Sequence, residues 1–312
     1  MKNTLNKLLA IAIICVFVFA RTNAQQYGQM SQYMFNKMVV NPAFAGNSPV
    51  LNVSLDYRKM YMGFEGAPTT QFLTASIPFQ LKNMAVGLKV INDKVGVNNS
   101  LSFDAIYAFQ IGFGKGKLSM ALEGGILNSS INYDGLARDD ENDDAIPVKK
   151  ISKLVPNADF GVYYNTDKWY IGATAYHLIQ GKIDYSGAGV GEKLATHLFF
   201  IAGYNYSMSK DVKLEPSILL KNVKGVPVQL DINAMVDYKN MLSVGVSYRI
   251  KDALAIIASF NLMEELRIGY SYDLSMSELK TYHSGTHEIM LSYSYKLPAP
   301  PRKKTVDPRY YY

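Results

Sequence analysis

The residues from Leu242 to Ile250 alternate between apolar and polar side chains without a break. Because successive side chains of a strand point to opposite faces, this pattern predicts a strand with one apolar face and one polar face. The same alternation recurs in Val228–Asp237 and Leu266–Leu274. Segments of about ten alternating residues between turns are typical of transmembrane β-barrels. A soluble sheet protein can contain single strands of this kind, so the fold class depends on the rest of the chain.

The N-terminus has the pattern of a secretory signal peptide. Lys2 and Lys7 precede an apolar run of 13 residues from Leu8 to Ala20, and Ala24 stands before the expected cleavage at Gln25. The run is shorter than the roughly 20 residues that a membrane-spanning helix needs. We therefore expect residues 1–24 to be removed on export.

Composition narrows the classes of protein further. Cys15 is the only cysteine, so the exported chain has none and no disulfide can stabilise it. Removing Lys2, Lys7 and Arg21 lowers the formal net charge from +6 to +3, which is too mild to indicate nucleic-acid binding. The 23 tyrosines and 14 phenylalanines fit the aromatic girdles of a barrel at the membrane interfaces.

The alternation and the turn signals predict 14 strands. They lie near Leu51–Arg58, Thr69–Phe79, Asn83–Asp93, Ser100–Ile111, Lys117–Ile131, Ala158–Asn165, Trp169–Leu178, Thr196–Ser207, Val212–Lys221, Val226–Tyr238, Met241–Ile250, Ala253–Leu262, Leu266–Leu274 and Glu288–Leu297.

The lengths of the links between these strands alternate. Every second link is short, as at Thr166–Lys168 and Lys239–Asn240, whereas the long links Asn132–Asn157, Ile179–Ala195 and Ser275–His287 all fall between them. Bacterial barrels have short periplasmic turns, long outer loops and an even number of strands. We therefore predict an antiparallel 14-stranded transmembrane β-barrel over residues 51–297, in the outer membrane, with both termini periplasmic.

Two segments lie outside this barrel. Residues 25–50 contain a stretch that does not alternate and fits a short helix or turn packed inside the barrel. Residues 298–312 begin with Pro298, Pro300 and Pro301, which prevent strand pairing and favour an extended periplasmic tail.

The segment Ser31–Gly46 carries a resemblance to a known family. Its signature residues are Ser31, Gln32, Tyr33, Asn36, Asn41, Pro42 and Gly46. This stretch, placed directly after a signal peptide, resembles the start of PorP/SprF proteins of the type IX secretion system, found in gliding and adhesin-secreting Bacteroidota. The family's terminal Pro-Arg-Tyr pattern is similar to Pro308, Arg309 and Tyr310, although two further tyrosines follow here.

The resemblance implies a 14-stranded FadL-like barrel with a plug-like N-terminal segment and no enzymatic activity. It implies partners as well: a secreted adhesin with a type B C-terminal domain, and periplasmic or peptidoglycan-associated components of the secretion machine. Outer-membrane lipid and lipopolysaccharide would surround the barrel.

Residues able to support chemistry are few. His283 and His287 are the only closely spaced histidines, and their setting predicts a solvated loop pair rather than a metal site. Asp140, Asn142 and Asp144 mimic the start of a calcium loop, but Ala145 stands where such a loop needs glycine, so a solvated acidic loop is favoured. We expect no cofactor and no catalytic residues.

Charged residues of both signs fall on the predicted inner face, which suggests a lumen that is either filled with water or plugged and held by ion pairs. They are Asp56, Arg58, Lys89, Asp104, Glu123, Asp159, Glu215, Asp231, Asp237, Arg249, Arg267 and Asp273.

The C-terminal tail is basic and aromatic, a composition that suits a contact with a periplasmic partner as well as a merely soluble end. Its candidate partner-binding residues are Arg302, Lys303, Lys304, Arg309, Tyr310, Tyr311 and Tyr312.

The leading functional hypothesis is a component of the type IX secretion and gliding system that binds, anchors or helps to secrete a surface protein through its outer loops. The alternative is a FadL-like passive channel for hydrophobic small molecules, which predicts a continuous apolar pocket in the lumen. A soluble periplasmic β-domain is the third class.

Overall fold

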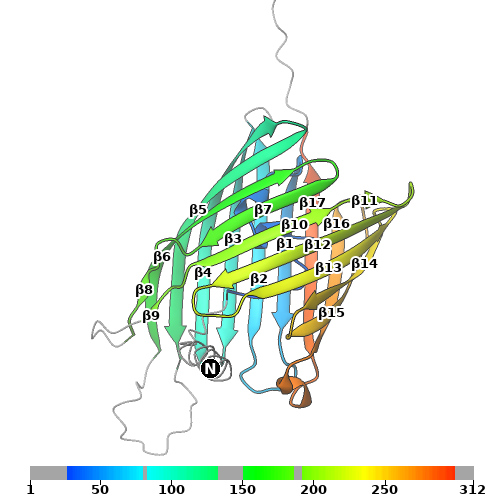
Figure 1. Ribbon diagram of the computed structural model, residues 1–312. Helices are drawn as coiled ribbons and strands as arrows, with labels where there is room; N and C mark the ends of the chain where they lie inside the picture. Colours follow the sequence, from blue (N-terminus) through cyan, green and yellow to red (C-terminus); the bar gives the residue numbers. More distant parts are fainter. Residues whose placement is uncertain (1–26, 80–82, 133–149, 186–191, 299–312) are drawn as a thin grey trace, which may run out of the picture.

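The computed structural model describes residues 27–79, 83–132, 150–185 and 192–298. They form an antiparallel β-barrel around a short N-terminal segment (Figure 1). The strands of the wall are β1 (Val50–Lys59), β2 (Thr69–Phe79), β3 (Met84–Val95), β4 (Asn98–Phe113), β5 (Gly116–Ile131), β6 (Ile151–Asn165), β7 (Trp169–Tyr176), β10 (His197–Tyr204), β12 (Val212–Val223), β13 (Gln229–Tyr238), β14 (Leu242–Arg249), β15 (Ala253–Asn261), β16 (Leu266–Ser275) and β17 (Thr286–Lys296).

The sheet closes on itself. The first and last strands pair from Val50 opposite Lys296 to Lys59 opposite His287, and β10 pairs with both β7 and β12. The two-residue strand β11 (Tyr206–Ser207) extends the pairing with β12, and β8 (Lys182–Ile183) and β9 (Glu192–Lys193) form a separate small hairpin. The predicted 14-stranded barrel is therefore confirmed.

The alternation of β14 divides its side chains between two environments. Val244 and Val246 are each 45% exposed on the outside of the barrel, whereas Ser247 and Arg249 are 1% and 2% exposed on the inside. An apolar outer face and a polar inner face are what a barrel in a lipid bilayer requires. In the part of the chain that the structure describes, no helix is long and apolar enough to cross a bilayer.

The loops sort to the two ends of the barrel as predicted. We call the end that carries residues 60–68, 177–196 and 276–285 the long-loop end; the last of these links contains the 3-10 helix η4 (Glu278–Thr281). The opposite end, with residues 114–115, 166–168 and 239–241, is the short-turn end. Lys239 and Asn240 both have positive φ (55° and 52°), which suits the twist of a tight hairpin turn.

Most predicted strand bounds lie within three residues of the observed ones. Two predicted strands differ from the structure in a more informative way. Strand β6 starts at Ile151 rather than at Ala158, although it contains Pro156. The stretch of β6 around Pro156 pairs with β5 but not with β7. Proline is tolerated at such an edge, where the missing N–H has no ladder partner to lose. The predicted strand Thr196–Ser207 is interrupted at Asn205, between β10 and β11.

The described chain does not begin and end on one side of the barrel. Tyr27 contacts His177 and His197 in the half of the lumen nearest the long loops, whereas Pro298 follows β17 at the short-turn end. Which compartment each end faces stays a prediction.

Candidate functional site

The lumen holds residues 27–46, which we call the plug segment. It contains two short 3-10 helices, η1 (Lys37–Val39) and η2 (Pro42–Phe44). Its apolar side chains join inward residues of the wall in one hydrophobic cluster, in which Met30, Tyr33, Met38 and Val39 are buried. The non-alternating stretch therefore supplies the apolar core that a polar barrel interior lacks.

Ser31 and Gln32 are bound by a carboxylate of the last strand. The backbone N–H groups of both residues donate to Glu288, each at 2.8 Å, and the Gln32 side chain donates to the Glu288 carbonyl oxygen at 3.1 Å. Glu288 is fully buried, so these donors replace water for a charge that would be costly to leave unpaired.

The Ser31 hydroxyl lies between two arginines. It donates to Asp273 at 2.7 Å and accepts hydrogen bonds from Arg58 at 2.9 Å and Arg249 at 3.1 Å. Arg58 also forms ion pairs with Asp273 at 2.7 Å and Glu288 at 2.9 Å. Strands β1, β14, β16 and β17 thus meet at one small residue of the plug segment, β17 at its backbone N–H and the other three at its hydroxyl.

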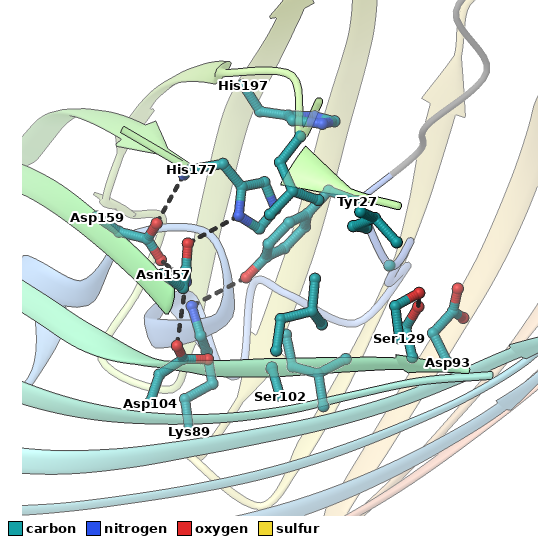
Figure 2. A pocket seen from close by; sticks show the side chains of 16 residues that line it. Tyr27, Lys89, Asp93, Ser102, Asp104, Ser129, Asn157, Asp159, His177 and His197 are labelled. Carbon is teal, nitrogen blue, oxygen red and sulfur yellow. Dashed lines mark hydrogen bonds between the residues drawn. The ribbon is translucent and has the colours of Figure 1, made fainter. Parts of the chain in front are cut away.

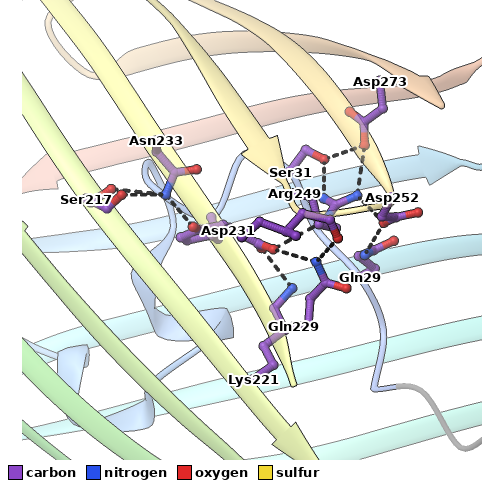
Figure 3. A network of polar contacts seen from close by, with 12 residues as sticks. Gln29, Ser31, Ser217, Lys221, Gln229, Asp231, Asn233, Arg249, Asp252 and Asp273 are labelled. Carbon is purple, nitrogen blue, oxygen red and sulfur yellow. Dashed lines mark hydrogen bonds and ion pairs between the residues drawn. The ribbon is translucent and has the colours of Figure 1, made fainter. Parts of the chain in front are cut away.

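The network continues along the wall from Arg249 (Figure 3). Arg249 pairs with Asp252 at 3.0 Å and approaches Asp231 at 3.6 Å, and Lys221 pairs with Asp231 at 3.1 Å. Gln29 donates to Asp252 at 3.4 Å, which adds a second plug residue to the same network.

The middle of the plug segment is held by hydrogen bonds from two asparagine side chains, Asn36 and Asn233. Tyr33 Oη accepts a hydrogen bond from Asn233 at 2.6 Å, and Asn36 donates to Thr74 at 3.0 Å and to Asp56 at 3.3 Å. Both Tyr33 and Asn36 are buried.

The Asn41–Pro42 turn sits in a recess of the wall. The Asn41 side chain caps η2 by accepting from Ala43 N–H at 2.9 Å and donates to the Val162 carbonyl oxygen at 2.9 Å. A side chain at Gly161 would collide with Asn41, and its absence makes room for the turn. Gly46 packs against Ala85 with φ +70°, a conformation that favours glycine.

The short-turn end of the lumen contains a hollow of about 780 Å³ next to the plug segment. Lys37 pairs with Glu215 at 2.9 Å and lies 4.8 Å from the ring centre of Tyr170. Arg267 lies 5.2 Å from the ring centre of Phe35. Aromatic and charged residues therefore share this hollow.

A smaller cavity of about 130 Å³ lies toward the long-loop end (Figure 2). The Tyr27 ring stacks on Tyr176 with 4.5 Å between centres, and its hydroxyl accepts from Lys89 at 2.9 Å. His177 donates through its backbone to Asp159 at 2.7 Å, and its ring pairs with Asn157. Burial lowers the pKa of His177, because the charged imidazolium loses its hydration there.

The predicted site residues have different outcomes. The structure brings all seven signature residues together in the lumen, as expected for a plug, and buries nine of the twelve predicted inner charges. Glu215, Asp237 and Arg267 also line the lumen, at the hollow of the short-turn end, but are only partly buried. The calcium candidates Asp140, Asn142 and Asp144, the signal peptide and the tail residues from Arg302 to Tyr312 lie outside the described residues.

Histidine spacing along the chain was a poor guide to proximity. His287 lies in β17 and its Nδ1 is 2.7 Å from the Tyr270 hydroxyl, while His283 accepts from the Gly285 N–H, so the two do not form a loop pair. Instead His177 and His197 come together, with 5.7 Å between ring centres. His177 follows the end of β7 and His197 begins β10. Because these two strands are antiparallel neighbours, the residues at the two ends of the link between them lie close together, and this pairing could have predicted their proximity.

The fold and the filled lumen define a class: a β-barrel protein of the outer membrane whose interior is occupied by its own N-terminal segment. A family model described as type IX secretion system membrane protein PorP/SprF matches residues 22–293. The chain belongs to this family, and its role lies in type IX secretion at the outer membrane, with partners in that system. A comparison with curated proteins found no match.

Solved structures with the same fold are distant in sequence. The Ralstonia pickettii toluene transporter TbuX is 10% identical, with a TM-score of 0.51 over 84% of this chain and 93% of that one. A deltaS2S3 mutant of the monoaromatic hydrocarbon channel TodX is 11% identical, with a TM-score of 0.50 over 83% and 94%. A Pseudomonas aeruginosa FadL homologue has a TM-score of 0.42 at 12% identity over 79% and 89%. The likenesses to TbuX and TodX concern the fold alone.

Proposed function

We propose that the protein is a plugged outer-membrane component of type IX secretion that binds a secreted surface protein at its long-loop end. In this proposal it anchors the secreted protein, an adhesin with a type B C-terminal domain, or assists its export. The basic and aromatic tail after Pro298 connects the barrel to periplasmic or peptidoglycan-associated components of the machine. The protein acts by binding, not by catalysis.

The observation that supports this proposal best is the attachment of the plug segment. Ser31 alone contacts Asp273, Glu288, Arg58 and Arg249, and all five residues are buried. A segment held by several buried, charge-assisted hydrogen bonds stays in place, because removing one partner of such a network is strongly destabilising. The two ends of the barrel are then the surfaces left for partners.

The alternative, a passive channel for hydrophobic small molecules, rests on the names of the fold neighbours, a toluene transporter and a monoaromatic hydrocarbon channel. Such a channel needs a continuous apolar path. The long-loop cavity here is small and is lined by Asp93, Asp104 and Asp159. The plug segment and these carboxylates argue against the alternative.

The long-loop end also offers exposed apolar side chains suited to a protein partner. Tyr282 is 70% exposed and Phe64 55% exposed, and both lie in links between strands. Large apolar and aromatic side chains of this kind carry most of the energy in protein interfaces.

Affinity purification from native membranes tests the proposal. The tagged wild-type chain should recover a secreted surface protein together with secretion components, and the variant F64S/Y282S should recover less of the surface protein. The matched control M208S/M263S changes two apolar residues that are 59% and 65% exposed at the short-turn end. Recovery of neither a surface protein nor a secretion component by the wild type contradicts the proposal.

A further inference from the structure

The cavity at the long-loop end carries an excess of negative charge. Its walls contain the carboxylates of Asp93, Asp104 and Asp159 and the ammonium of Lys89. Lys89 is already paired, because its Nζ lies 2.6 Å from an oxygen of the buried Glu123. Three carboxylates, Asp104, Glu123 and Asp159, therefore lie around this one ammonium, and each of them is at most 2% exposed. Several carboxylates buried close together repel one another, so this group favours an additional cation.

Two acceptor groups of the cavity have free positions. Asn157 donates to Asp104 Oδ1 at 3.0 Å, but Oδ2 of Asp104 has no donor among the described residues. The His197 ring lines the cavity and is 3% exposed, and in the described chain it makes ring contacts but no hydrogen bond. A buried imidazole normally has a hydrogen-bond partner, so the nitrogens of His197 are open to a ligand in the cavity.

The remaining groups disfavour a metal ion, although Asp104, Glu123 and Asp159 bring oxygens within 4.8 Å of one another. The ammonium of Lys89 already lies 2.6 Å from an oxygen of Glu123, so that carboxylate is engaged. Asp159 accepts from Asn157 at 3.1 Å and from the His177 N–H at 2.7 Å, which uses both of its oxygens. A group that donates hydrogen bonds in several directions fits the free positions better than a metal that needs several free carboxylate oxygens.

The walls also suit the apolar and delocalised part of an organic cation. The Tyr27 ring lines the cavity beside the His177 and His197 rings, each with 6.1 Å between ring centres. Aromatic faces attract ammonium and guanidinium groups. The volume of about 130 Å³ admits a single side chain or a small molecule.

We propose that this cavity is a binding site for one organic cation, a guanidinium or ammonium group, which Asp104 and His197 accept and the Tyr27 ring faces. The site lies at the end of the lumen near the long loops. It does not depend on the proposed binding of a surface protein, because the ligand is defined by the charge and the acceptors of the cavity.

Calorimetric titration of the purified full-length protein in detergent at pH 7.5 tests the site, with methylguanidinium and propylammonium as probes. The wild type should bind at least one probe. The isosteric D104N should weaken it by about tenfold or more, the size expected for losing a hydrogen bond to a charged group. H197F keeps an aromatic ring without the acceptor and should weaken binding by about threefold or more. D237N, at the hollow of the short-turn end, is the matched control and should bind like the wild type.

The peptide Gly-Arg-Gly separates two sources of the cation. Binding of the peptide as well as the free probes points to a side chain of a partner protein, whereas binding of the free probes alone points to a small molecule, and both results support the site. The proposal is overturned if the wild type binds neither probe, or if D104N and H197F bind the probe with the same affinity as the wild type. A wild type that binds Ca²⁺ or Zn²⁺ and neither organic cation also overturns it. Heat-dependent migration in SDS gels confirms that each variant is folded.

Discussion

The hydroxyl of Ser31 uses every hydrogen-bonding position that a serine has. It donates to Asp273 and accepts from Arg58 and Arg249, which brings two guanidinium groups to one oxygen atom. The positive charges are balanced by Asp273 and Glu288 from neighbouring strands. The plug segment and the closure of the barrel between β1 and β17 therefore depend on the same few buried residues.

Glu288→Ala should destabilise the folded barrel strongly. The change leaves Arg58 with one carboxylate partner and two backbone N–H groups without an acceptor, which typically costs about 3–5 kcal/mol for a buried pair. Urea unfolding in lipid vesicles measures the loss. The control Glu264→Ala removes the exposed pair with Lys296 and should leave the free energy of unfolding unchanged. Equal losses in the two variants would contradict the assigned role of Glu288.

Stability should fall as the pH drops below about 6.5, the ordinary pKa of histidine. Burial lowers the pKa of His177 in the folded protein, so the unfolded chain takes up the proton more readily. The contribution of neutral His177 is intact above the unfolded pKa and is lost as the pH falls toward the folded one. His177→Asn should show a smaller loss of unfolding free energy between pH 7.5 and pH 5. Asparagine tolerates the positive φ of 58° at this position. An unchanged slope would show that His177 makes no such contribution.

The individual contacts between residues of the lumen could not be predicted from the sequence. The signature residues could be assigned to a plug, but the partners of Ser31 lie 27 to 257 residues away and depend on the register around the closed barrel. The pairing of His177 with His197 likewise follows from the return of the chain through the link between β7 and β10. The local sequence pattern does not specify which acidic residue of the lumen forms an ion pair with which basic residue.

At the scale of the element, strands were predictable because lipid and lumen impose opposite demands on alternate residues. All 14 wall strands overlap the predicted ones, and β2 matches in both bounds. The errors occurred where the two-sided demand is absent: β6 extends past the end of β7, and β10 ends near the short-turn end of the barrel. At these places the strand lies at an unpaired edge or at the end of the barrel, where its two faces are not divided between lipid and lumen.

Val246→Arg should test the assignment of the outer face. Val246 lies in the middle of β14 between Ala234 and Ile256 and is 45% exposed. An arginine near the bilayer midplane costs about 2–4 kcal/mol, whereas one near the interface costs about 0–1 kcal/mol. Ile250→Arg, just beyond the end of β14, is the matched control. Unfolding from lipid vesicles should distinguish the two variants, and equal effects would contradict the placement of β14 across the membrane.

At the scale of the whole molecule, a barrel of 14 strands is wide enough to hold a segment of its own chain. The plug segment fills the lumen from the hollow beside Lys37 to the cavity beside Tyr27. It links inner charges on β1, β14, β16 and β17 to apolar residues on β2, β7 and β10, so the wall and the plug form one hydrophobic and polar core. A molecule built in this way holds a segment of its own chain in the lumen along much of the barrel.

Removing the plug segment should therefore turn a closed barrel into a pore. In planar lipid bilayers the wild type should show no stepwise ion conductance, while a variant lacking residues 27–46 should, because its polar lumen fills with water. Since that deletion also removes core residues, Ser31→Lys serves as a second variant: its ammonium lies beside Arg58 and Arg249 and repels both, which loosens the segment. The control Lys59→Ser changes an exposed residue of β1 and should remain closed. Conductance of the wild type equal to that of the deletion would mean that the plug segment does not close the barrel, and would favour the passive-channel alternative.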